Sequence, residues 1–317
     1  MKIKEIYALA IAEGMAADPR GEAAAKDVMA KAQKAYDKLD EDDKPFFDME
    51  RLQNPYGDTR ILNGDPETEV KKAIVGVDME LQELLLTDRL NEKGAGIDLV
   101  IAHHPEGPAL LNLAQVMELQ PKAFAEAGVQ LNVAEALMDG RTPDVEVSVG
   151  VSNHSRAVRA AELLGLNMMC IHTPCDNLVN TYLTKYMAEK APETVGDVCR
   201  LLRELPEYAA EAKKNNPPRI VAGKASRSAG KVFVDMTGGT GGPKEYYGLL
   251  SQNGIGTVLC MHARKEVIDA AKAAHISVII AGHMGSDSLG INLLMDKLAA
   301  KGLDIVACSG FTRVQRG

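Results

Sequence analysis

Four apolar runs in this chain end at a histidine, and this repeated pattern is the strongest restriction on its fold. The runs are short and rich in β-branched and other large apolar residues, which is typical of strands buried on both faces of a sheet. They are 99–102 before His103 and His104, 168–171 before His172, 257–261 before His262, and 276–282 before His283. Five of the seven histidines in the chain therefore close an apolar run.

Histidines in these positions predict a metal site. The segments between the runs have helical periodicity, so we expect mainly parallel sheets with helices on their faces. In open parallel sheets, ligands bind just beyond the carboxyl ends of the strands. A lone histidine is more often structural than a ligand, but five in equivalent positions favour ligation. The alternative is that these histidines only form hydrogen bonds to the loops.

The adjacent histidines His103 and His104 predict two ions rather than one. Side chains alternate along an extended chain, so the two rings are expected to point in opposite directions. Asp176 and Asp287 each follow a strand-end histidine by four residues, and carboxylates can bridge a pair of cations. Mixed imidazole and carboxylate ligands suit Zn, Mn, Fe or Co rather than Ca. Asp287 could instead only cap the helix that follows it.

His172 and His262 are the candidates for proton transfer. His172 could also ligate a metal or orient a ligand, and His262 could also be a ligand or simply end a strand. Asp78 and Asp235 end two further apolar runs, and the sequence does not decide whether they reach the site. The glycine-rich loop 237–243 could bind an anion through its backbone N–H groups or only form a tight turn.

Composition excludes several classes of partner. The net charge of −8 argues against non-specific binding to nucleic acid or to anionic lipid. No apolar stretch reaches the roughly 18 residues of a membrane span, and no signal-peptide pattern is visible. The five cysteines are an odd number without framework spacing, which indicates reduced thiols in the cytoplasm. We expect a protein of the cytoplasm that acts on a small molecule.

The chain divides into three parts by composition and rhythm. Residues 1–53 predict a helical extension in which we see no chemistry. Residues 54–214 form a first α/β half with His103, His104 and Asp176. The sequence Lys213-Lys-Asn-Asn-Pro-Pro218 is a linker signal, so residues 215–317 form a second α/β half with His283 and Asp287. In this second half, strands at 231–235, 256–261, 276–281 and 304–308 alternate with three helices, which predicts one mainly parallel sheet.

Three motifs resemble the signatures of the Nif-three-like dinuclear metal family, also called GTP cyclohydrolase 1 type 2 homologs. They are His103-His104-Pro105, His172-Thr-Pro-Cys-Asp176 and Gly282-His283-Met-Gly-Ser-Asp287. Asp78 and the glycine-rich loop also fall where that family has an aspartate and a glycine-rich turn. The resemblance covers about residues 54 to 317 and leaves out the N-terminal helices. The family usually has Glu where this chain has Asp287.

This resemblance implies a site, an assembly and an activity. One ion would take His104, Asp176 and Asp287, the other would take His103 and His283, and Asp287 would bridge them. The family forms toroidal homo-hexamers. It implies a hydrolase that uses two divalent ions (Zn, Fe or Mn) on a small anionic or nucleotide-like substrate. The alternative is a non-catalytic metal-binding scaffold or regulator.

Overall fold

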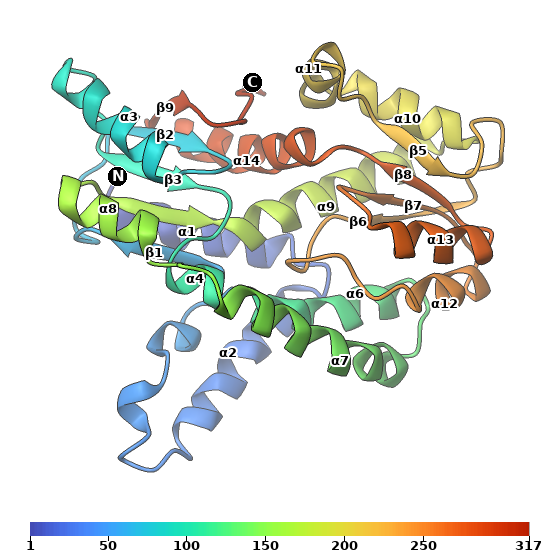
Figure 1. Cartoon of the computed structure of the whole chain (residues 1–317), viewed down its shortest axis with the longest axis horizontal. Helices are drawn as coiled ribbons and strands as arrows, with labels where there is room; N and C mark the ends of the chain where they lie inside the picture. The colour runs from blue at the N-terminus through green and yellow to red at the C-terminus, as the bar shows by residue number, and fades with distance from the viewer. Residues whose placement is uncertain (317) are drawn as a thin grey trace.

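The computed structural model describes residues 1–316 and contains two open sheets that lie at opposite ends of the molecule (Figure 1). Most neighbouring strands are parallel, and helices flank both sheets, so the predicted α/β class is confirmed. The strands are β1 (Thr59–Asn63), β2 (Lys72–Gly76), β3 (Leu99–Ala102), β4 (Met168–Ile171), β5 (Arg219–Ala222), β6 (Lys231–Asp235), β7 (Ile255–Cys260), β8 (Ser277–Ile280) and β9 (Asp304–Ala307).

The first sheet has the strand order β1-β4-β3-β2-β9. Its three inner strands are parallel to one another, and only β1 runs antiparallel, against β4. All four residues of β3 and all four of β4 are buried, as the unbroken apolar runs predict for strands covered on both faces. Both strands therefore deliver their following histidines to the same edge of the sheet.

The second sheet has the order β5-β8-β7-β6, with β5 as the antiparallel edge. The predicted strands at 231–235, 256–261 and 276–281 are present as β6, β7 and β8. The prediction for the last strand was wrong, because β9 leaves this half and pairs in parallel with β2 of the first sheet. Strand propensity marks a segment as extended, but it does not choose which sheet edge the segment joins.

Helices cover the faces of the sheets and fill the space between them. They are α1 (Ile3–Ala16), α2 (Glu22–Tyr36), α3 (Leu81–Glu92), α4 (Pro108–Leu111), α5 (Leu113–Val116), α6 (Gln120–Glu126), α7 (Leu131–Gly150), α8 (Arg156–Leu164), α9 (His172–Lys190), α10 (Val195–Glu204), α11 (Pro206–Lys213), α12 (Tyr246–Gln252), α13 (Lys265–Ala273) and α14 (His283–Ala299). No helix within residues 1–316 is long and apolar enough to cross a lipid bilayer.

The helices α9 and α14 pack side by side in the middle of the molecule and connect the two halves (Figure 1). Buried residues of α14 contribute to the core below the first sheet, and Leu289 contributes to the core of the second half. From α9, the Asn180 side chain accepts a hydrogen bond from the Met236 backbone N–H, directly after β6. The position of one sheet relative to the other is therefore set by this helix pair.

The N-terminal residues divide into a packed helix and a projecting arm. In α1, Ile3 and Ile6 are fully buried in the first core, and α1 lies against α9. The helix α2 extends away from the body of the molecule (Figure 1), and Phe46 in the segment after it is 88% exposed. Of the predicted N-terminal extension, α1 is thus packed into the first core, and only the part that begins with α2 projects from the molecule.

Candidate metal centre

Two helices each begin with a histidine followed by an aspartate four residues later. His172 and Asp176 open α9, and His283 and Asp287 open α14. Residues four apart lie on one face of a helix, so each pair presents an imidazole and a carboxylate together. Sequence periodicity predicted that α14 begins near residue 288 with Asp287 as its cap. The helix in fact begins five residues earlier, after Gly282, whose φ of 107° lies in the region that favours glycine.

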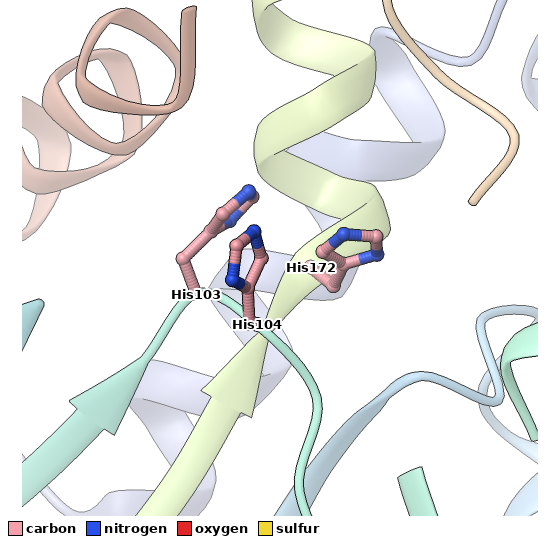
Figure 2. Close-up of side chains that lie close together, drawn as sticks. All are labelled: His103, His104 and His172. Carbon is pink, nitrogen blue, oxygen red and sulfur yellow. The ribbon is translucent and has the colours of Figure 1, made fainter. Parts of the chain in front are cut away.

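The adjacent histidines lie immediately beyond β3 at the same edge. His103 and His104 donate their backbone N–H groups to the carbonyls of Gly76 and Val77, each at 2.9 Å. The rings of His103, His104 and His172 gather where β3 and β4 end (Figure 2). The expectation that the two neighbours point in opposite directions was wrong. Both rings turn toward one carboxylate, because β3 ends at Ala102 and strand alternation ends with it.

Asp287 lies between two groups of ligand atoms and offers one oxygen to each. Its Oδ1 is 3.6 Å from His103 Nε2, which is itself 3.5 Å from Asp176 Oδ1. Its Oδ2 is 3.4 Å from His283 Nε2 and 3.7 Å from His104 Nε2. The histidines therefore pair the opposite way from the resemblance: His103 lies with Asp176, and His104 lies with His283.

These separations fit metal ligands better than hydrogen bonds. They exceed the roughly 2.7–3.2 Å of an N–H···O hydrogen bond. Four ligands placed about 2.1 Å from one ion in a tetrahedron lie about 3.4 Å apart, close to the four distances observed. Within each group, the ligand atoms all lie within 4.8 Å of one another. The group of His103, Asp176 and Asp287 and the group of His104, His283 and Asp287 could each hold an ion.

The polar atoms at the centre have no partner among the described residues. Both ring nitrogens of His103 and both carboxylate oxygens of Asp287 are buried without a hydrogen bond. Each residue is 1% exposed. A buried polar group left unpaired costs about 1–3 kcal/mol, and a charged one costs more. His103 Nε2 and the two Asp287 oxygens face the cluster and therefore need a further partner, which a cation would supply.

Burial and charge set the protonation of this cluster without ions. Burial lowers the pKa of His103 to about 4, so the ring is neutral and has a free lone pair. Burial also acts on Asp287, but the surrounding histidines hold the pKa of its carboxyl below the usual value. Burial raises the pKa of Asp176 to about 8. The cluster thus combines a neutral imidazole with a carboxylate that stays ionised.

Two aspartates outside the cluster orient its histidines. His104 Nδ1 lies 2.6 Å from Asp78 Oδ1, and His172 Nδ1 lies 2.7 Å from the buried Asp58 Oδ2. In both rings Nε2 is left to face the cluster, as is usual for histidines that ligate metals. Burial opposes the charged form of His172, but Asp176 and Asp58 outweigh it and raise the pKa of His172 to about 9.

A cavity of about 440 Å³, partly open to solvent, adjoins the cluster. Its lining includes His172, Asp176, His283, Asp235 and the exposed His262, together with the glycine-rich loop. The ring centroids of His262 and His283 are 5.2 Å apart. Asp235 thus reaches the site, and burial raises its pKa to about 7.

Of the histidines and aspartates described above, the sequence analysis singled out all except Asp58, which supports His172 from outside the cavity lining. Asp58 sits in the turn-rich loop before β1, where nothing in the local pattern distinguishes it from the other turn residues.

The glycine-rich loop shows the close packing that its composition allows. A Cβ on Gly239 would lie 2.9 Å from Val116 Cγ2, and φ there is +77°.

Two solved structures place this architecture among known proteins. A NIF3 superfamily protein from Sphaerobacter thermophilus is 26% identical, with a TM-score of 0.73 over 91% of this chain and 98% of that chain. HcgD from Methanocaldococcus jannaschii, in its reduced form, is 14% identical with a TM-score of 0.51 over 78% of this chain and 87% of that chain, which shows the fold alone. No family profile and no curated protein matches the sequence.

The match to the Sphaerobacter protein also corrects the extent of the resemblance. It leaves out about 29 of the 317 residues, which is fewer than the 53 of the predicted N-terminal extension. Part of that extension is therefore shared with the superfamily protein, in agreement with the packing of α1 in the first core.

Proposed function

Because the chain has the fold of the NIF3 superfamily, we propose that it is a dinuclear-metal-dependent hydrolase. Its substrate would be a small anionic or nucleotide-like molecule. The observation that supports this most directly is that the buried polar atoms of His103 and Asp287 have no hydrogen-bond partner among residues 1–316. A structural role for these side chains would give them hydrogen-bond partners within the protein.

The two ligand groups define which residues would hold the ions. One ion would take His103, Asp176 and Asp287 Oδ1, and the other would take His104, His283 and Asp287 Oδ2. Asp287 would bridge them. Imidazole with carboxylate is a ligand set for Zn, Fe or Mn. Asp78 and Asp58 would keep the rings of His104 and His172 in the tautomer that presents Nε2.

The residues around the cavity would move protons and position the substrate. When bound, a pair of divalent ions lowers the pKa of a shared water toward about 7 and polarises a carbonyl or phosphoryl oxygen. His262, exposed at the cavity, can carry a proton between the substrate and solvent. His172 holds its Nδ1 on Asp58, so its Nε2 can donate or accept a proton inside the cavity.

A non-catalytic metal-binding scaffold or regulator is the second candidate, and one observation favours it. His172 has a ring nitrogen within 4.8 Å of ligand atoms of His103 and His104. If His172 filled the fourth coordination position of one ion, that ion would have no place for a water or a substrate. Single-turnover hydrolysis that depends on the bound metal would decide between the two candidates. A cytoplasmic location and a homo-hexameric assembly remain proposals that rest on composition and on the resemblance.

Metal content per chain tests the proposal. After chelation and reloading with Zn, Mn or Fe, elemental analysis should find about two ions per wild-type chain. Asp287→Asn should lose both ions, and Asp176→Asn should lose one. The matched control is Asp42→Asn, which removes an exposed carboxylate remote from the cluster. A wild-type protein that refuses all three metals would overturn the dinuclear assignment.

Activity is tested separately on the loaded protein. Phosphoesters, amides and nucleotides would be screened with the wild type, with the metal-free protein and with His262→Gln. We expect hydrolysis that disappears on chelation, returns on reloading, and falls about 10²–10⁴-fold in the variant if His262 transfers the proton. Full activity in the metal-free protein would contradict the proposed chemistry.

A further inference from the structure

A second cavity of about 550 Å³ adjoins the metal centre and is not used by the proposed ligands. Asp235, Cys260 and His262 line both cavities, as do Thr240 and Gly241 of the glycine-rich loop. The two spaces are therefore neighbours that share one wall. A molecule that occupies both would place one end beside the ions and the other end in this second cavity.

Two arginines from distant parts of the chain line the second cavity. Arg141 comes from α7 and Arg264 from the residue before α13. Among residues 1–316, Arg141 Nε is buried and has no hydrogen-bond partner. Burial and the positive charge of Arg264 together lower the pKa of Arg141. A guanidinium group that is partly desolvated beside a second cation has an unmet need for an anion.

The acidic groups near the two arginines leave this need in place. Arg264 Nη1 pairs with Glu266 Oε1 at 2.9 Å, but both side chains are about half exposed, so this pair is weak. The negative charges of Asp144 and Glu266 act to raise the pKa of Arg141, but they do so by charge alone. Asp235 is the carboxyl group that lines the cavity itself.

The rest of the lining is apolar and aromatic. Phe124, Tyr247 and Val267 form part of the wall, and Phe124 is held by stacking on Tyr246 with ring centroids 3.7 Å apart. Apolar walls with a few convergent polar groups are typical of small-molecule sites. Such a wall suits the carbon skeleton or ring that carries an anionic group.

We propose that Arg141 and Arg264 bind a phosphate group of the substrate. The rest of the substrate would extend past Asp235, so that its reacting bond lies at the metal centre. Two guanidinium groups offer forked N–H donors that match the oxygens and the double charge of a phosphate. This proposal rests on the proposed hydrolase function, because it names the substrate class of the same site. In this proposal, Arg141 and Arg264 determine specificity for the phosphate group and do not touch the reacting atoms.

Inorganic phosphate is the probe, and the metal-free protein is the sample. Phosphate binding is followed by calorimetry and by amide chemical shifts after EDTA treatment, so that ions cannot bind the probe. We expect saturable binding that weakens about tenfold or more in Arg141→Gln and in Arg264→Gln. Arg141→Lys should recover part of the affinity, because it restores charge without the fork. The control Arg227→Gln removes an exposed arginine outside the cavity and should bind like the wild type.

The outcomes separate this proposal from the proposed hydrolase function. Absence of phosphate binding in the metal-free wild type, or equal binding in all the arginine variants, would overturn the arginine site. Arg264 is exposed, so its variant keeps the test valid even if Arg141→Gln does not fold. Metal-free Asp287→Asn should still bind phosphate. If that variant binds phosphate but the reloaded wild type holds no metal, the arginine site stands and the hydrolase proposal fails.

Discussion

Gly290 lies where α14 meets α9, and replacing it with alanine tests whether the helix pair positions the metal centre. A Cβ at this residue would lie 2.4 Å from the carbonyl oxygen of Cys175 and 3.0 Å from its carbonyl carbon. Ordinary contacts begin near 3.4 Å, so the two helix backbones would have to separate by up to about 1 Å. Asp176 lies on α9 and Asp287 lies on α14, so each helix of this contact carries one carboxylate of the metal centre.

The expected change in stability has two opposing parts. Alanine is favoured over glycine inside a helix by about 1 kcal/mol. Overpacking of a buried contact costs about 1–3 kcal/mol and more when only backbone can yield. Since the clash at Gly290 is with backbone, we take the overpacking cost at the upper end of this range or above it, and after the gain in helix propensity we expect Gly290→Ala to lower the free energy of unfolding by about 2 kcal/mol or more.

Gly140→Ala is the matched control, because Gly140 is also in a helix and a Cβ there meets nothing within 4 Å. It should raise the free energy of unfolding by up to about 1 kcal/mol. Urea unfolding of the metal-free proteins measures both values, and elemental analysis then measures the ions that each variant retains. We expect Gly290→Ala to lose metal and Gly140→Ala to keep it. A Gly290→Ala protein as stable as Gly140→Ala would refute the reasoning.

Three further predictions concern the supports of the site and of the fold. Asp78→Asn should weaken metal affinity about 10–100-fold by freeing the ring of the ligand His104, as competition with a chelating dye would show. Thr194→Ala removes the cap that accepts a hydrogen bond from the Asp197 N–H at 3.1 Å, and should cost about 1 kcal/mol in urea unfolding. Burial acts to raise the pKa of Asp48, but its pairing with Arg60 holds that pKa below the usual value. This depressed carboxyl contributes stability above its unfolded pKa of about 3.9, which is lost as the pH falls through its folded pKa. The stability difference between the wild type and Asp48→Asn should therefore vanish in acid, and a constant difference would contradict this role.

Local sequence patterns were sufficient to find the strands that carry the centre. The apolar runs before His103, His172 and His283 became β3, β4 and β8. A run of large apolar residues needs a covered face whatever its neighbours are, so such elements can be read without knowing the tertiary structure. The same holds for the positions of the histidines at the ends of those strands.

Side-chain direction was harder to predict than element position. His103 and His104 were expected to diverge, yet both face Asp287. Alternation applies only inside a strand, and these residues lie one and two positions beyond its end. The helix α14 begins at His283 rather than near residue 288, because its first residues, His-Met-Gly-Ser, have no apolar periodicity that would mark them as helical.

The sequence by itself determined the class of fold, the position of the strand ends and the residue types gathered there, because these depend on local hydrophobic pattern. Only the tertiary structure decided that β9 joins the first sheet, that Asp58 supports His172, and that Arg141 and Arg264 share a cavity. Each of these contacts joins segments separated by more than a hundred residues. Such contacts depend on how whole layers pack, and no local periodicity in the chain records that choice.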